Sequence, residues 1–381
     1  MIDLALRGIG WLVRRVVPIA IVLGILAAVL LVWGRNGLGH IGWLIRRVVP
    51  LAIVLGILAA VLLVWGRDGL EDHPLFSLIE YAPYPIYLLP FLVLVPAAFL
   101  AGRVWVLLAL AGLIFVATEV MGLQIHLGES GSNRIRVLTF NVKDYITRRE
   151  PLGLVDIADE IARHDPDIFV LQDARSFQQN VIDPTFARAL FGDRKTFNFG
   201  QYVIASRFPL HDCRNGWISF RDEPHTYAAC VVSVQGREVD LVTTHFMTPR
   251  AGLEAARFNP IRGMREWMEN ASDRMTQARL LAADVQALNR PVIVAGDLNA
   301  PTTSPVVRAL LDTGLRDAFS VAGLGYGYTW GHSLRFRLSF LRIDHILVSR
   351  EFRVARSFVG NAAGSAHRPV IADLYLSSEG R

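Results

Sequence analysis

Cysteine is nearly absent from the sequence, with only Cys213 and Cys230 among 381 residues. The two do not have the spacing of metal-binding cysteines, and no cluster of cysteine and histidine indicates a zinc site. They lie on segments that could form neighbouring strands of a hairpin around residues 221–225. A disulfide would form there in an oxidising compartment, but two buried free thiols are the interpretation that we favour.

Lysine is equally scarce, since only Lys143 and Lys195 are lysines and arginine carries almost all of the basic charge. The arginines are scattered, with no long run or stripe, so they do not form the basic surface that is typical of nucleic-acid-binding proteins. We interpret the preference for arginine as a coding bias of the source genome.

Charged residues are sparse before about residue 122, where leucine, valine, isoleucine, alanine and glycine dominate. The whole chain is 52% hydrophobic with a mean hydropathy of +0.36, which is too apolar for a wholly soluble protein. Later residues have the mixed composition of a globular domain. We therefore predict a membrane region at 1–122, a linker at 123–132 and, at 133–378, one globular domain of the size of a catalytic domain.

An internal repeat occupies much of the membrane region, because residues 9–38 and 41–70 are almost identical. Each copy contains an arginine pair and then an apolar run, at 16–33 or 48–65. Each run is long enough to cross a bilayer as a helix, with tryptophan and arginine near the interface. The near-identity of the copies indicates a recent tandem duplication or an artefact of assembly.

Two further hydrophobic segments follow, at 81–102 and at 104–118, and they indicate two helices or a re-entrant hairpin. A signal peptide is the competing interpretation of the first segment, but no small-x-small cleavage site clearly follows it. The positive-inside rule predicts that both arginine pairs, at 14–15 and 46–47, lie on the cytoplasmic side of the membrane. If one copy of the repeat is discounted, three spans that start in the cytoplasm place the globular domain outside the cell membrane. If all four segments span, the globular domain lies in the cytoplasm. We expect a multi-pass protein of a bacterial inner membrane and prefer an extracytoplasmic domain.

In the globular domain, an apolar run at 292–295 stops at Gly-Asp-Leu-Asn, residues 296–299. The run predicts a buried strand, so Asp297 and Asn299 lie just beyond its carboxyl end. A carboxylate and an amide that a rigid strand delivers together suit a hard metal ion or a phosphoryl oxygen. A turn or a helix N-cap is the alternative.

The same arrangement recurs along the domain, where predicted strands end in polar side chains. Strands are predicted at 135–142, 168–172, 202–208, 228–234, 239–244, 292–296, 343–348 and 370–375, and helices at 152–163 and 274–288. This pattern predicts a four-layer α/β sandwich, in which two packed mixed β-sheets are flanked by helices. Strand ends can meet at one edge of such a sandwich and form one polar site. The residues placed in this way are Asn141, Asp173, His245, Asp297, Asn299, Asp344 and His367.

Six short motifs follow one another along the domain. They are Leu-Thr-Phe-Asn at 138–141, Leu-Gln-Asp at 171–173, Thr-His-Phe at 244–246, Gly-Asp-Leu-Asn at 296–299, Arg-Ile-Asp-His at 342–345 and Ser-Ala-His-Arg-Pro at 365–369. In this order they resemble the endonuclease/exonuclease/phosphatase family, the superfamily of pancreatic-type deoxyribonuclease, abasic-site endonucleases and neutral sphingomyelinases. One motif is weak, but six in order are specific. The membrane region lies outside the resemblance.

The resemblance implies a metal site near Asn141 and Asp173, with Asp344 serving the second part of the metal site or of the histidine site. Asp173 stands where the family usually has glutamate, so its shorter side chain would hold the ion at a longer distance or through water. Magnesium fits best, with Mn²⁺ as the alternative, because the candidate ligands are oxygens.

The resemblance also implies the catalytic residues. Asp297 would orient or deprotonate the attacking water, and Asn299 would hold a phosphate oxygen. His245 and His367 would contact the phosphate and stabilise its developing charge. The implied activity is hydrolysis of phosphodiester or phosphomonoester bonds by a membrane-anchored enzyme.

One departure from the family concerns Ala366, which stands where the last motif usually has aspartate beside the histidine. Without that carboxylate, either His367 works poorly, another carboxylate substitutes, or activity is largely lost. A phosphate- or lipid-headgroup-binding module without strong activity is therefore the alternative to an enzyme. A scaffold role of the membrane region is the weakest hypothesis, because no charge interrupts the apolar runs to mark a transport path.

The sequence gives only weak signals for residues that contact the substrate. Arg207 is a candidate for a substrate phosphate and Trp330 for the wall of the site, although a solvated arginine and a packing tryptophan are the ordinary alternatives. A loop expected at 247–272 carries arginines and aromatic residues that suit a nucleic-acid backbone or a lipid headgroup. The expected partners are such a phosphodiester and the lipid bilayer, and no protein partner is evident.

Overall fold

The computed structural model describes residues 39–66, 74–147, 149, 153–178, 181–259, 262–334 and 337–377. The chain divides after Leu123 into two compact units. The first copy of the repeat, at 9–38, lies outside the described residues, and so does the span predicted within it. Residues 124–132, which the sequence suggests as a linker, belong to the second unit, where β1 (Gln124–Ile125) pairs with β11 (Leu324–Gly325).

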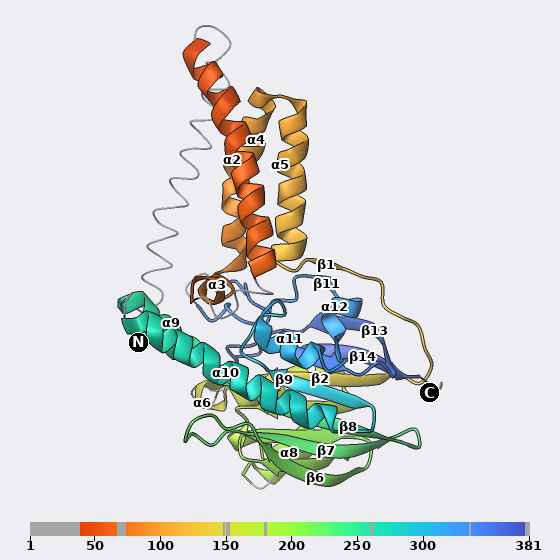
Figure 1. Cartoon of the computed structure of the whole chain (residues 1–381). Helices are drawn as coiled ribbons and strands as arrows, with labels where there is room; N and C mark the ends of the chain where they lie inside the picture. The colour runs from red at the N-terminus through yellow and green to blue at the C-terminus, as the bar shows by residue number, and fades with distance from the viewer. Residues whose placement is uncertain are drawn as a thin grey trace. The chain divides into compact units, whose positions relative to one another are not determined.

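The first unit is helical (Figure 1). Its elements are α2 (Gly39–Gly66), α3 (Pro74–Ile79), η1 (Tyr84–Leu88), α4 (Leu89–Ala101), α5 (Arg103–Phe115) and η2 (Val116–Val120). Small buried residues such as Ala98 and Ala109 pack against Ile53 and let the helices approach closely. Among the described residues, three helical segments are long and apolar enough to cross a membrane by length and composition, namely Arg46–Gly66, Tyr84–Ala101 and Arg103–Val120.

The second unit contains two six-stranded mixed sheets. In sheet order, the first consists of β10 (Arg316–Asp317), β12 (Asp344–Val348), β9 (Val292–Asp297), β8 (Arg237–His245), β7 (Thr226–Val234) and β6 (Leu210–Trp217). The second consists of β13 (Phe352–Val359), β14 (Val370–Leu376), β2 (Ile135–Asn141), β3 (Ile168–Gln172), β5 (Tyr202–Ser206) and β4 (Lys195–Phe199). The pairs β8–β9 and β2–β3 are parallel, and the other pairs are antiparallel.

Helices cover the outer faces of both sheets. Their bounds are α6 (Asp144–Thr147), α7 (Gly153–His164), η3 (Arg175–Phe177), α8 (Pro184–Phe191), α9 (Arg250–Phe258), α10 (Arg262–Gln286), α11 (Pro305–Leu311) and α12 (Ala318–Ala322). Alternate strand residues such as Val170 and Leu241 form one core between the sheets. The other residues pack outward, Val294 against α10 and α11, and Phe169 against α7 and α8. This order of layers confirms the predicted four-layer α/β sandwich.

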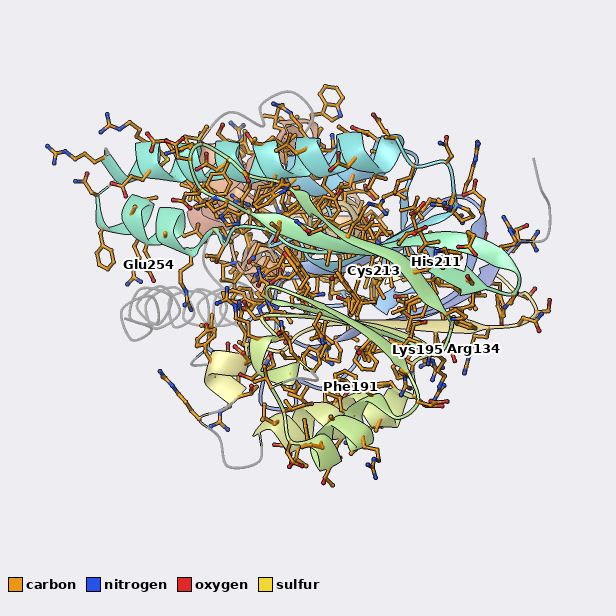
Figure 2. All side chains as sticks on the ribbon, turned by 90° about the horizontal axis from the view of Figure 1, so that it is seen from below. Arg134, Phe191, Lys195, His211, Cys213 and Glu254 are labelled. Atoms are coloured by element: carbon orange, nitrogen blue, oxygen red, sulfur yellow. A yellow bond between two sulfur atoms is a disulfide. The ribbon has the colours of Figure 1, made fainter. Side chains whose placement is uncertain are left out.

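The two cysteines form a disulfide, so the expectation of free thiols is wrong. Cys213 lies on the edge strand β6, close to His211 in Figure 2, and Cys230 lies on the neighbouring strand β7. The ladder between β6 and β7 shifts register between His211 and Arg214, which brackets Cys213. Their Cα atoms are 4.0 Å apart because antiparallel pairing brings facing positions of adjacent strands together.

The predicted loop at 247–272 is mostly helical, since it contains α9 and the first part of α10. Trp267 is fully buried, and the guanidinium of Arg274 lies 5.3 Å from its ring centroid. The buried face of α10 is partly polar, so its helical periodicity is weak in the sequence before Arg274. Trp267 therefore belongs to the core and offers no surface to a substrate.

Candidate functional site

Three site residues form a row across the first sheet. His245 at the end of β8 pairs with Asp297 on β9, and Asp297 pairs with Asp344 on β12. Residues in register on adjacent strands point to the same face, here the face toward the second sheet. Gly296 permits this arrangement, because a Cβ atom there would lie 2.0 Å from the carbonyl oxygen of Thr244.

The second sheet contributes Asn141 from the end of β2. Its amide Nδ2 donates to Asp297 Oδ2 at 2.8 Å, which joins the two sheets across the site. The backbone N–H of Lys143 donates to Asn141 Oδ1 at 3.1 Å. Because an N–H can donate only to the oxygen, this bond fixes the orientation of the amide.

Asp297 lies at the centre of the site and is fully buried. Its Oδ1 accepts from the backbone N–H of Asn299 at 2.9 Å. Its Oδ2 lies 3.4 Å from His245 Nε2 and 3.8 Å from His367 Nε2. Asn299 donates its side-chain amide to the carbonyl of Phe246 at 2.8 Å, so this amide helps to hold the strand end.

His367 has a carboxylate partner despite Ala366. Its Nδ1 lies 3.0 Å from Asp344 Oδ2, and both side chains are buried. Burial raises the pKa of Asp344 to about 7 and lowers the pKa of His367 to about 4. Burial therefore disfavours the charged form of each of the two groups. Asp344 on β12 of the first sheet is thus a carboxylate partner for His367, in a motif where Ala366 replaces the usual aspartate.

His245 is held from three sides. Its Nδ1 lies 2.8 Å from Gln201 Oε1 and 3.6 Å from Asp173 Oδ1, and its backbone N–H donates to the hydroxyl of Tyr202. Burial lowers the pKa of His245 more than the Asp297 carboxylate raises it. Gln201 was not a candidate from the sequence, because the turn between β4 and β5 gives no signal of its position.

Lys143 is a site residue that the sequence motifs do not include. Its Nζ lies 2.7 Å from Asp173 Oδ2. Burial lowers the pKa of Lys143, but the carboxylates of Asp173 and Asp297 outweigh this effect, and the net pKa lies above the ordinary value. Its position two residues beyond Asn141, in a chain with only two lysines, is the signal that could have identified it.

Three site residues adopt left-handed backbone conformations, with φ of 46° at Lys143 and 48° at both Asp173 and Asn299. For residues other than glycine this conformation costs roughly 1–2 kcal/mol each. Such strain persists only where the surrounding structure imposes it, and it is frequent at functional sites. The left-handed conformations after the strand ends therefore orient the side chains of Lys143, Asp173 and Asn299 in the site.

Arg207 is not a site residue, and the prediction of a substrate contact is wrong. It forms ion pairs with Asp165 and Asp167, beside the start of β3. Because β5 runs antiparallel to β3, the residue that follows β5 lies at the end of the sheet away from Asp173. Trp330 does lie beside the site, since its backbone bridges to His367, and its ring packs edge-on against Phe340 at 5.4 Å.

The donor set fits a divalent cation. Asp297, Asp344 and His367 each place one ligand atom within 4.8 Å of the others. Of the predicted ligands Asn141, Asp173 and Asp344, only Asp344 belongs to this group. The carboxylates of Asp297 and Asp344, like that of Asp173 nearby in the site, are hard oxygen donors, which suit Mg²⁺ or Mn²⁺.

A buried ion pair supports the strand that carries Asp344. Arg342 Nη1 lies 2.5 Å from Asp317 Oδ2, and both side chains are buried. His345 Nε2 lies 2.9 Å from the carbonyl oxygen of Ala300, which gives this buried histidine a structural role. Asp317 also caps α12 by accepting from the backbone N–H of Phe319.

We expect Asp317→Asn to lower the free energy of unfolding by about 3–5 kcal/mol, because it leaves the buried Arg342 charge without its partner. Burial raises the pKa of Asp317, but Arg342 and His345 outweigh it and the net pKa is lowered from 3.8. The stabilisation is therefore present above pH 3.8 and is lost as the pH falls toward the folded-state pKa. Denaturation of both proteins at pH 7 and pH 3 measures the difference. The same change at exposed Asp312 is the control, and equal losses at the two positions would contradict this account.

Comparisons with known proteins identify one protein family. The model of the endonuclease/exonuclease/phosphatase family matches residues 138–367. A comparison with curated proteins found no match. Among solved structures, an endonuclease/exonuclease/phosphatase from Beutenbergia cavernae is 20% identical over 64% of this chain and 72% of that chain, with a TM-score of 0.48. A mannosyl-6-phosphatase from Bacteroides thetaiotaomicron is 19% identical over 64% and 100%, with a TM-score of 0.48. The catalytic domain of human Nocturnin with bound sulfate is 20% identical over 64% and 94%, with a TM-score of 0.47.

Proposed function

The chain belongs to the endonuclease/exonuclease/phosphatase family, whose members are phosphoric ester hydrolases, and from this premise we propose a specific activity. We propose that the protein is a membrane-anchored, divalent-metal-dependent hydrolase of phosphodiester or phosphomonoester bonds. The observation that carries the proposal is the position of the buried Asp297 carboxylate. It lies between two histidines and is held by hydrogen bonds from Asn141 and the Asn299 backbone.

In the proposed mechanism, Asp297 accepts a proton from the attacking water, because its carboxylate is oriented by two donors and excluded from bulk solvent. Asp344 accepts a hydrogen bond from the Nδ1–H of His367. This bond orients the ring so that Nε2 faces Asp297 and the reacting phosphate. With Nδ1 held by Asp344, a protonated Nε2 would donate to a phosphoryl oxygen. His245 is oriented in the same way by Gln201 and faces the same phosphate. Asn141 and Asp173, the ligands that the resemblance implies, would hold a divalent cation, which would supply positive charge to the phosphoryl oxygens and leave Asp297 and His367 for proton transfer.

Metal removal tests this proposal. We expect the purified full chain to hydrolyse an aryl phosphodiester or an aryl monophosphate, and EDTA to lower the rate by a factor of about 100 or more. Added Mg²⁺ or Mn²⁺ should restore it. His245→Ala should lower the restored rate by about 10²-fold or more. Exposed His211, on an edge strand, provides the matched control. Equal rates of parent, His245→Ala and His211→Ala would refute the proposed site.

We propose that the domain lies outside the cytoplasm of a bacterial cell. The Cys213–Cys230 disulfide supports this placement, because such bonds persist in oxidising compartments. If the first copy of the repeat is discounted, the positive-inside rule puts Arg46 and Arg47 in the cytoplasm, and the three candidate spans among the described residues then lead to the same side. There the substrate would be the phosphoric ester of a lipid headgroup or of extracytoplasmic nucleic acid.

Thiol labelling tests the compartment. In protein extracted without reductant and denatured, we expect a maleimide reagent to modify neither Cys213 nor Cys230, and to modify both after reduction, because they are oxidised in the cell. Cys213→Ser is the control and should expose Cys230 to the reagent. Labelling of both cysteines in the unreduced parent would contradict the extracytoplasmic placement.

A further inference from the structure

Lys143 is an unusual choice of residue in this chain. Of 39 basic Lys and Arg residues only two are lysines, and the other, Lys195, is exposed on the edge strand β4. Lysine has a compact ammonium on a flexible stem, whereas arginine has a wide planar fork. A small point charge at position 143 can therefore enter a space between carboxylates that a guanidinium would overfill.

The backbone positions this ammonium. Lys143 follows β2 directly, with its N–H bonded to Asn141 Oδ1. Asp173 follows the neighbouring strand β3, and its carbonyl accepts from the backbone N–H of Asp144 at 3.0 Å. The two strand exits are thus tied together by hydrogen bonds of the main chain. The hydrogen bond between Asp144 and Asp173 brings the side chain of Lys143 next to that of Asp173. The two side chains are only 17% and 22% exposed.

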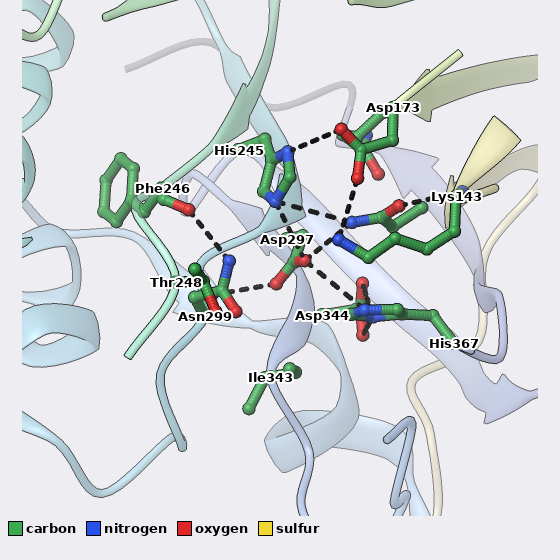
Figure 3. Close-up of polar contacts among 12 residues, drawn as sticks. Lys143, Asp173, His245, Phe246, Thr248, Asp297, Asn299, Ile343, Asp344 and His367 are labelled. Carbon is green, nitrogen blue, oxygen red and sulfur yellow. Dashed lines mark hydrogen bonds and ion pairs between the residues drawn. The ribbon is translucent and has the colours of Figure 1, made fainter. Parts of the chain in front are cut away.

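The ammonium also lies among the residues that would hold the divalent ion. It contacts the carboxylate of Asp173, and the charge of Asp297 acts on it as well. Figure 3 shows its amine turned toward the centre of the site, between Asp173 and Asp297. The close group of Asp297, Asp344 and His367 does not include Asp173. One carboxylate of the site is therefore neutralised by a cation of the protein itself.

We propose that Lys143 is a built-in cation that competes with the divalent ion for Asp173. The proposal rests on the proposed function in that a divalent ion enters this site. An ion that takes Asp173 as a ligand must displace the ammonium and accept a second positive charge close by. The parent protein therefore binds the ion more weakly than the same carboxylates would without Lys143, and it retains a positive charge for an anionic substrate.

Mn²⁺ binding to the full chain in detergent, followed by calorimetry and by the electron paramagnetic resonance of free Mn²⁺, tests the competition. We expect Lys143→Met to bind Mn²⁺ at least about tenfold more tightly than the parent, because a repelling charge is removed. Lys195→Met is the matched control and should bind as the parent does. The double variant Lys143→Met/Asp173→Asn should lose the gain, because the added affinity depends on Asp173.

Lys143→Gln serves the same purpose if the methionine variant does not fold, as judged by its melting temperature. Equal or weaker Mn²⁺ affinity without the ammonium overturns the competition, and so does a gain that survives the loss of Asp173. The rate of hydrolysis distinguishes this failure from failure of the proposed function. If hydrolysis still depends on Asp297 while the parent and Lys143→Met bind Mn²⁺ equally well, the proposed enzyme activity is retained and only the proposed role of Lys143 is refuted.

Discussion

Asp297→Asn is expected to lower kcat/KM for an aryl phosphodiester by about 10³-fold or more, since general-base catalysis contributes about 10²–10⁴-fold and orientation of the water is lost as well. The amide has nearly the same shape as the carboxylate but cannot accept a proton from water. Asp297 accepts from two donors, Asn141 Nδ2 and the backbone N–H of Asn299. An amide oxygen can satisfy only one of them, so a loss of about 1–2 kcal/mol in stability should accompany the change.

The measurement is a Michaelis–Menten series with the full chain at saturating Mg²⁺, together with melting temperatures. Asp312→Asn makes the same chemical change on an exposed residue and should leave both quantities unchanged. A folded Asp297→Asn protein that keeps its rate within tenfold of the parent would show that another group activates the water. His245 would then be the next candidate, because its Nε2 lies 3.4 Å from the same carboxylate.

The sequence predicts the interior of the sandwich well and its edges poorly. The strands predicted at 135–142 and 292–296, like the six others, correspond to strands that have neighbours on both sides. In the two six-stranded sheets, the strands that it misses are β10, β6, β13 and β4, which lie at the edges. An interior strand is covered on both faces and consists of a continuous apolar run, whereas an edge strand such as β6 alternates irregularly between polar and apolar residues.

The candidate site shows a similar division. Residues at the ends of interior strands, such as Asp297 and Asp344, could be identified because strand ends meet at one edge of the sandwich. Lys143 and Gln201 lie in turns whose direction depends on contacts that are distant in sequence. Arg207 was misplaced because the pattern of a strand does not reveal whether it runs parallel or antiparallel to its neighbour. The partner of His367 could not be derived either, because Asp344 reaches it from the other sheet.

Asp344→Asn is expected to lower kcat by about 10²–10⁴-fold, because an amide still orients the His367 ring but no longer stabilises its added proton. Stability should move in the other direction. Burial raises the pKa of Asp344 to about 7, so its contribution to stability is present below the unfolded-state value of 3.8 and is lost as the pH rises through about 7. At pH 8 the variant should therefore melt at or above the temperature of the parent, which separates lost catalysis from lost structure.

Ala366→Asp is the companion variant, and it separates an enzyme from a binding module. Ala366 is 8% exposed, and the Nδ1 of His367 is already occupied by Asp344. A new carboxylate would add buried charge without a vacant partner, so we expect no more than about a threefold gain in rate and a lower melting temperature. A large gain from a nearly inactive parent would mean that Asp344 does not substitute for the missing aspartate and that the domain is a degraded enzyme. Clear activity of the parent, abolished by Asp344→Asn and not increased by Ala366→Asp, is the outcome that the His367–Asp344 pair requires.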